Sequence, residues 1–277
     1  MNLSQNIRLP AVAGLFYPGK KNDLDREIAI FLENAPELNI SGPIRGLVVP
    51  HAGYMYSGGV AARAYRQLLD SDIEIAVVIS PSHREYFTEV SVFNGSGYAT
   101  PLGTIPVARE LAQSLADTNP QIIISEKGHR FDEHALEVQL PFLQKVLDEF
   151  ELLPIVMGEH SYDNIQTLAE GLSTVLRDKK AIIIASSDLS HFYSASKAQL
   201  LDKVVAEHIA DFDQDALFHD LQSGQCEMCG GGPVVAVMKT SKLVGAKNSK
   251  VIMYRHSGDV TGDNSEVVGY LSALFYD

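Results

Sequence analysis

Histidine and acidic side chains follow three separate runs of apolar, β-branched residues in the sequence. These side chains are His51, His83, Asp188 and His191. In open α/β sheets, ligands bind outside the carboxyl ends of the strands, where loops from several strands converge. Each residue alone is a weak indication, because a lone His after a strand is more often a structural hydrogen-bond partner. Their shared placement predicts one common site.

Two cysteines stand immediately before a glycine-rich segment and an apolar run. Cys226 and Cys229 precede Gly230–Pro233, and Val234–Val244 is expected to form a helix. A thiol at a helix N-terminus has a lowered pKa, because the helix dipole and the free backbone amides favour thiolate. Three interpretations stay open: Cys229 joins imidazoles on a metal, the pair acts as a redox motif, or both residues are inert and buried.

A metal site in this chain needs imidazole ligands beside cysteine, because two cysteines are too few for a four-cysteine zinc site. Two His and one anionic ligand, with coordination positions left open, form the arrangement that binds Fe(II) for oxygen chemistry. Here the anion would be a thiolate instead of a carboxylate. Zinc binds comparable Cys/His sets that keep an open position, so the residue types do not separate the two metals.

A second group of polar residues lies in the periodic segment Asp132–Phe150. Its members are Glu133, His134, Glu137 and Gln139. On a helix His134 and Glu137 would share a face, where they could donate protons or orient a ligand. The alternative is a solvated helix N-terminus, at which acidic residues are favourable anyway. The other histidines lack a comparable context and are interpreted as surface or structural residues: His129, His160, His208, His219 and His256.

The elements that must position these residues alternate between strand and helix patterns. The expected strands are Arg45–Val49, Glu74–Ser80, Glu89–Phe93, Gln121–Ser125, Glu151–Met157, Ala181–Ser186, Lys250–His256 and Glu266–Leu274. Helical periodicity is expected in Ser57–Leu69, in Ser161–Arg177 behind an N-cap at Ser161, and in Asp132–Phe150 with a kink or a new helix at Pro141. This alternation predicts a mainly parallel central sheet with helices on both faces, and the last two strands are expected to pair antiparallel.

Composition narrows the class of protein. The chain has 277 residues, 45% of them hydrophobic, and a formal net charge of −13. The acidity disfavours a nucleic-acid or anionic-membrane partner, because phosphate binding needs a positive surface. Two Cys cannot form a disulfide framework, and no run approaches the roughly 18 apolar residues of a membrane span. With no readable secretory signal or linker, we expect one cytoplasmic domain over residues 1–277.

Six sequence blocks closely resemble the Memo family, whose bacterial and archaeal members are called AmmeMemoRadiSam system protein B. The blocks are RLPAVAGLFYP at Arg8–Pro18, PHAGYMYSG at Pro50–Gly58, SPSH at Ser80–His83, EHALEVQLPFL at Glu133–Leu143, SSDLSH at Ser186–His191 and CGGGP at Cys229–Pro233. They occur in family order, so the resemblance covers nearly the whole chain.

The resemblance implies a fold and a ligand set. The Memo family is similar to LigB-type class III extradiol dioxygenases, which hold non-haem iron with two His and a Glu in a sheet flanked by helices. The residues that match the family's metal site are His51, His83 and Cys229, with Cys in place of Glu. Asp188 and His191 match residues that line the same pocket. His134 matches the EHS-type block, although the next residue here is Ala instead of Ser.

The residues and the resemblance together support three functional hypotheses. The first is a non-haem iron oxidoreductase of the dioxygenase type, with Fe(II) on His51, His83 and Cys229, and with His191, Asp188 and His134 as catalytic residues; zinc and copper are the alternative metals. The second is a non-catalytic module that binds a small-molecule or peptide ligand in the same pocket. The third is a role beside AMMECR-type and radical-SAM proteins in a modification pathway, which follows from the family name. Thiol exchange through the cysteine pair ranks last.

Overall fold

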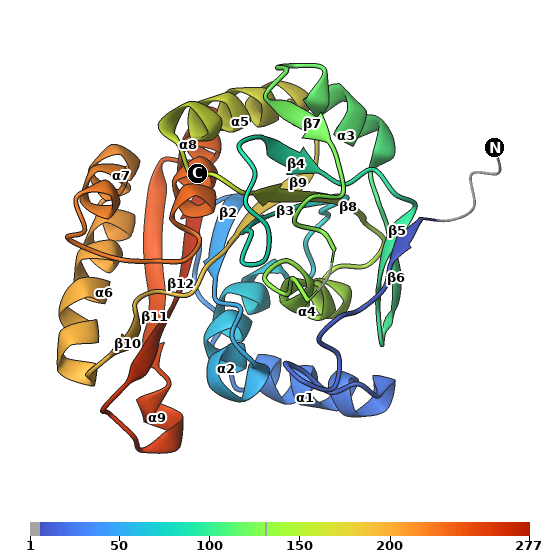
Figure 1. The fold of residues 1–277 in the computed structure, drawn as a ribbon. Helices are drawn as coiled ribbons and strands as arrows, with labels where there is room; N and C mark the ends of the chain where they lie inside the picture. The colour runs from blue at the N-terminus through green and yellow to red at the C-terminus, as the bar shows by residue number, and fades with distance from the viewer. Residues whose placement is uncertain (1–5, 131) are drawn as a thin grey trace.

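The computed structural model describes residues 6–130 and 132–277, in which a large sheet is covered by helices on both faces (Figure 1). Within these residues the larger sheet has nine strands. In spatial order they are β10 (His191–Tyr193), β12 (Val267–Tyr276), β2 (Ile44–Val49), β9 (Ala181–Ser186), β3 (Ile75–Pro81), β8 (Glu151–Met157), β4 (Val90–Val92) and β7 (Ile122–Ile124), with β11 (Asn248–His256) paired to β12.

The direction of the strands corrects the expectation of a mainly parallel sheet. The central strands β2, β9, β3 and β8 are parallel, and β7 is parallel to β4. On one side β12 is antiparallel to β2, β10 and β11, and on the other β4 is antiparallel to β8. The sheet is therefore mixed. The central strands are apolar runs rich in β-branched residues because they are buried on both faces. The direction of the strands beside them depends instead on the path of the connecting segments, which this apolar pattern does not indicate.

Alternation along the central strands divides their side chains between two cores. Leu47 and Val49 face one core, while Val48 between them faces the other. The first core is covered by α1 (Lys21–Glu33), α2 (Tyr54–Tyr65) and α4 (Leu140–Val146). The second is covered by α3 (Arg109–Ala116), α5 (Tyr162–Val175), α6 (Ala195–Ala210), α7 (Gln214–Gln222) and α8 (Gly231–Leu243). Each central strand thus contributes to both layers, as the period of two requires.

The eight strands expected from the sequence are all present as β2, β3, β4, β7, β8, β9, β11 and β12, with small differences at their ends. The Ser161 side chain caps α5 by accepting the amide of Asn164 at 3.3 Å, as expected. The segment around Pro141 is shorter than its periodicity suggests. It forms the 3-10 turn η2 (Glu137–Gln139) and then α4, with Pro141 in the first turn, where its missing N–H costs nothing.

Several short elements complete the described residues. A second sheet contains β1 (Ile7–Arg8), β5 (Gly97–Thr100) and β6 (Gly103–Pro106), in that order. The 3-10 turn η1 (Arg66–Leu68) extends α2, and α9 (Gly258–Thr261) joins β11 to β12. Among the described residues, none of the helices combines the length and the apolar character that a membrane span requires.

Candidate metal centre

The carboxyl ends of β2, β9 and β3 lie side by side, because these strands are parallel neighbours in register. Val49 pairs with Ser186, and Ile79 pairs with Ala185. His51 and His83 each follow their strand by two residues, and Asp188 follows β9 by two residues. The loops that carry these residues are short, so the side chains converge at one edge of the sheet. The sequence predicted one common site for these three residues together with His191, which begins β10.

The imidazole of His51 is buried and held at one nitrogen. Its Nδ1 lies 2.9 Å from the Ser186 hydroxyl, and its backbone amide donates to the Asp188 carboxylate at 2.8 Å. The other nitrogen, Nε2, faces the Cys229 thiol at 3.3 Å. Burial, together with the neighbouring His83, lowers the pKa of His51 to about 3, so the ring is neutral at pH 7. A neutral ring with one nitrogen engaged is the form in which His binds metals.

His83 is oriented by the buried carboxylate of Glu133. The Nδ1 of His83 lies 3.1 Å from one carboxylate oxygen, and the His83 amide donates to the other at 2.5 Å. Burial raises the pKa of Glu133, but the hydrogen bonds and charge of His83 and the Ala135 amide outweigh it and lower the pKa to about 2. This ionised carboxylate fixes the ring of His83 with its Nε2 free, as the outer partners of metal-binding histidines do.

Cys229 lies just before α8, and its thiol sulfur accepts a hydrogen bond from the Asp188 amide at 3.2 Å. The pKa of this thiol is nevertheless raised, first by burial and then by the charge of Asp188. The hydrogen bond from the Asp188 amide and the contact with the Ser187 hydroxyl do not offset these effects. The expected lowering by the helix N-terminus is therefore wrong for the metal-free chain. Desolvation of a buried thiolate exceeds what one helix terminus supplies, so ionisation of Cys229 requires a cation beside it.

Two overlapping groups of side chains could hold a metal ion. In the first, His51, His83 and Cys229 offer ligand atoms within 4.8 Å of one another, and in the second His83, Glu133 and His134 do so. The first group fits a metal better. Both of its rings have their Nδ1 atoms engaged, and among residues 6–130 and 132–277 its thiol has no carboxylate or cation partner. Glu133, in contrast, already accepts hydrogen bonds from the amides of His83, His134 and Ala135. Three ligands leave positions open for substrate.

His134 stands in the turn before η2, not on a helix face shared with Glu137 as expected. Its ring stacks on His83 with centroids 5.0 Å apart, and it lies 5.4 Å from the His51 ring. Burial and the nearby His51 lower its pKa to about 4. His134 is therefore neutral at pH 7, and a pKa this far below 7 makes its ring a weaker base than an ordinary imidazole.

Glu137 and Gln139 are buried, which rules out the solvated helix terminus as their role. Gln139 donates to the Ser186 hydroxyl at 2.8 Å and to the Pro50 carbonyl at 2.9 Å, so it supports the strand ends behind His51. Nothing in the spacing of Gln139 distinguished this role, because its partners come from β9 and from the loop after β2.

Glu137 binds the segment Arg8–Tyr17, which we call the N-terminal strap, and holds it beside the centre. Its carboxylate pairs with Arg8 and accepts the Ala11 and Val12 amides at 2.8 and 3.0 Å and the Tyr17 hydroxyl at 2.5 Å. The strap carries Phe16, whose ring centroid lies 4.5 Å from that of His134. The buried carboxylate of Glu137 therefore helps to position Phe16 against the ring of His134.

Asp188 and His191, both expected as catalytic residues, have different surroundings. Asp188 is buried and its carboxylate accepts the amides of His51 and Ala52, so it holds the loop after β2 in place. Burial raises the pKa of Asp188. His191 instead begins β10 and lines a cavity of about 410 Å³, which Cys229 also lines.

His160 is a residue of this cavity that the sequence did not single out. It was interpreted as surface or structural, yet it lines the same cavity as His191, and burial lowers its pKa to about 4. A side chain at Gly232 would meet the ring of His160 at 2.7 Å, so the glycines after Cys229 allow this contact. Cys226 also lines the cavity, is almost fully buried and lies outside both ligand groups.

The fold and the site define an α/β protein with a candidate His/His/Cys metal centre at the carboxyl edge of its sheet. The model of the Memo-like protein family matches residues 8–274, and the chain belongs to this family.

Relatives from archaea match the chain along almost its entire length. A MEMO1 family protein from Methanobrevibacter smithii is 38% identical, with 97% of this chain and 99% of the relative covered. One from Nitrosopumilus maritimus is 34% identical with the same coverage. A crystal structure of an uncharacterized Escherichia coli K12 protein aligns with a TM-score of 0.51 at 12% identity, covering 83% of this chain and 99% of that chain. This last likeness concerns the fold alone, and the similarity to LigB-type dioxygenases stays a prediction.

Proposed function

We propose that this chain is a non-haem iron oxidoreductase of the dioxygenase type, in which His51, His83 and Cys229 hold Fe(II). The observation that carries the proposal is the convergence of three ligand atoms within 4.8 Å, with the Nδ1 of each ring already engaged by Ser186 or Glu133. When bound, iron would supply electron transfer between a coordinated organic substrate and O2.

The chain's own residues would bind and deprotonate the substrate. His134 is neutral at pH 7, so its ring can accept a hydrogen bond from a substrate hydroxyl and would receive its proton only as that hydroxyl becomes acidic, because a pKa of about 4 makes the ring a weak base. The cavity of about 410 Å³ beside Cys229 is large enough for a small molecule, and His191 and His160 line it. Asp188 is a positioning residue here, because its carboxylate holds the His51 amide.

The ligand set is tested by anaerobic loading with Fe(II) and metal analysis of two matched variants. Cys229→Ala removes a proposed ligand, whereas Cys226→Ala removes a buried thiol from the same segment. We expect the first variant to lose most of the bound iron and the second to keep it. Equal iron in Cys229→Ala and the unchanged chain would remove Cys229 from the ligand set.

The reaction class is tested separately, by oxygen uptake of the iron-loaded chain with a panel of catechols. Uptake that depends on His134, with iron content unchanged in His134→Ala, would support the proton-accepting role. A chain that binds iron through the proposed ligands and consumes no O2 with any catechol would contradict the dioxygenase assignment.

Exposed apolar residues favour one alternative, a binding module for a peptide. Met55, Tyr86 and Phe192 are all exposed, and each lies within four residues of His51, His83 or His191. Contiguous exposed apolar side chains are typical of surfaces that bind other proteins, and these three are close to the site's histidines in the sequence. Substitution of Met55 and Tyr86 by Ser should weaken peptide binding and leave iron loading unchanged if this module exists.

A further inference from the structure

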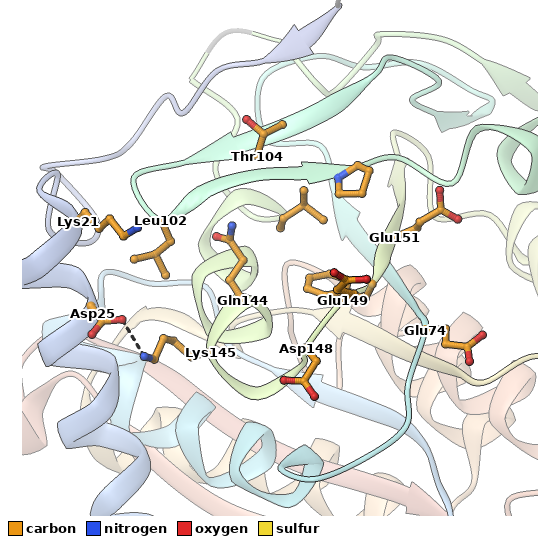
Figure 2. Close-up of a pocket in the computed structure, with 13 residues that line it drawn as sticks. Lys21, Asp25, Glu74, Leu102, Thr104, Gln144, Lys145, Asp148, Glu149 and Glu151 are labelled. Atoms are coloured by element: carbon orange, nitrogen blue, oxygen red, sulfur yellow. Dashed lines mark hydrogen bonds and ion pairs between the residues drawn. The ribbon is translucent and has the colours of Figure 1, made fainter.

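A groove with a volume of about 780 Å³ lies at the edge of the sheet that does not carry the metal centre, and Figure 2 shows the residues that line it. Glu151 is the first residue of β8 and Glu74 immediately precedes β3, so the groove adjoins the amino ends of the parallel strands. The length of β8 separates it from the carboxyl edge by about 20 Å. The groove therefore has no part in the proposed chemistry.

The floor of the groove is apolar and one of its walls is a strand edge. Ile105 and Phe150 are buried beneath it, and Leu102 and Pro106 also line it. Ile105 and Pro106 belong to β6, which ends the smaller sheet and pairs with β5. Its outer edge is open only over the residues between Gly103, whose carbonyl accepts from Gln144, and Val107, which bridges to Leu152. A strand edge with free main-chain groups can add an extended peptide as a further strand.

The charged residues of the groove are distributed unevenly. Asp148, Glu149 and Glu151 make no ion pair among the described residues, although all three are exposed. Figure 2 shows Glu151 and Glu74 on one side of the groove, Asp148 and Glu149 in the middle, and Lys145, paired with Asp25 at 2.7 Å, on the other side. Glu74 is paired with Lys180 at 3.2 Å. A ligand that neutralises the unpaired acidic side chains must carry positive charge.

We propose that the groove binds an extended, basic segment of a partner protein, laid along β6 with Lys or Arg side chains beside Asp148, Glu149 and Glu151. The charges exclude nucleic acid, since phosphate would be repelled. They also disfavour a second copy of this chain, because each copy has a net charge of −13. The apolar floor accepts the uncharged side chains between the basic ones, so a polycation without apolar groups fits less well.

The proposal is tested by fluorescence anisotropy with a fluorescein-labelled peptide KRVTVRK, at about 0.15 M salt to screen distant charges. Glu149→Lys combined with Glu151→Lys should weaken binding at least about fivefold, since several exposed charge pairs are replaced by repulsion. Asp211→Lys combined with Glu266→Lys makes the same change of charge at exposed positions just after α6 and just before β12, and should change binding by less than about twofold.

Two further probes separate the parts of the proposal. A peptide with N-methyl groups on its central residues cannot donate main-chain hydrogen bonds and should bind more weakly, whereas equal binding would overturn the strand pairing. Equal weakening by the two double variants would mean that net charge alone attracts the peptide. Absence of binding up to about 1 mM peptide, an affinity too weak for a specific docking site, would refute the groove as a peptide site. A dimer that only the groove variant dissociates would assign the groove to a second copy.

Discussion

The carboxylate of Glu137 offers the most informative perturbation, because it joins the N-terminal strap to the metal centre. The Glu137 side chain is fully buried and that of Arg8 is 8% exposed. In Glu137→Gln one carboxylate oxygen becomes an NH₂ group that faces N–H or O–H donors, and Arg8 loses its counter-charge. Breaking a buried ion pair by removing one partner costs about 3–5 kcal/mol, since a charge remains buried without compensation. We expect a loss of that size in the free energy of unfolding.

The assay is urea denaturation of the metal-free chain at pH 7, with two comparison variants. Tyr17→Phe removes one donor and leaves the carboxylate paired with Arg8, so it should cost only about 1 kcal/mol. Glu207→Gln breaks an exposed pair with Lys203 and should cost less than about 0.5 kcal/mol. A loss below about 1 kcal/mol in Glu137→Gln, or one no larger than in Tyr17→Phe, would refute the reasoning.

Three further predictions concern the supports of the centre and the buried histidines. Glu133→Gln removes the ionised partner of His83 and should weaken Fe(II) binding about 10–100-fold in a chelator competition, while leaving the fold intact by circular dichroism. Burial lowers the pKa of His129 to about 3, so below about pH 6.5 the unfolded chain takes up a proton on this residue and the folded chain does not. The free energy of unfolding should therefore fall as the pH falls. Between about pH 7 and about pH 5.5, His129→Asn should lose about 1 kcal/mol less of this free energy than the unchanged chain in urea titrations. Gly232→Ala places a methyl group 2.7 Å from the His160 ring and should cost about 1–3 kcal/mol despite the better helix propensity of Ala, and an unchanged midpoint would contradict this packing.

The sequence predicted the strands well because their signal is local. Buried β-branched runs such as Ala181–Ser186 have one structural interpretation, and a polar residue directly after such a run lies at the end of the strand. The short strands β5 and β6 were not expected, because four residues with glycines at their start carry almost no periodic signal. The groove along β6 was therefore invisible in the sequence.

The sequence named Glu133, His134 and Gln139 as candidates but could not predict their partners, for a related reason. The residues around Glu133 and His134 in the sequence do not indicate which side chains they contact, because His83 and His51 come from distant parts of the chain. Even the ionisation of Cys229 was misjudged, since its place before a helix is local, whereas its burial is a property of the whole fold. His160 was passed over, and Gln139 was named without its supporting role, because the contacts of both residues are formed entirely by packing.

The amino-acid sequence by itself determined which residue types could bind a metal and on which strand ends they stand. Both could be determined because the apolar pattern of a strand is a local property of the sequence, and the residues that follow it show where the strand ends. The tertiary structure alone decided that His51, His83 and Cys229 converge, that Glu133 and Ser186 engage the two rings, and that the thiol stays protonated without a cation. Those outcomes depend on distances and desolvation between segments far apart in the chain, which exist only once the chain is folded.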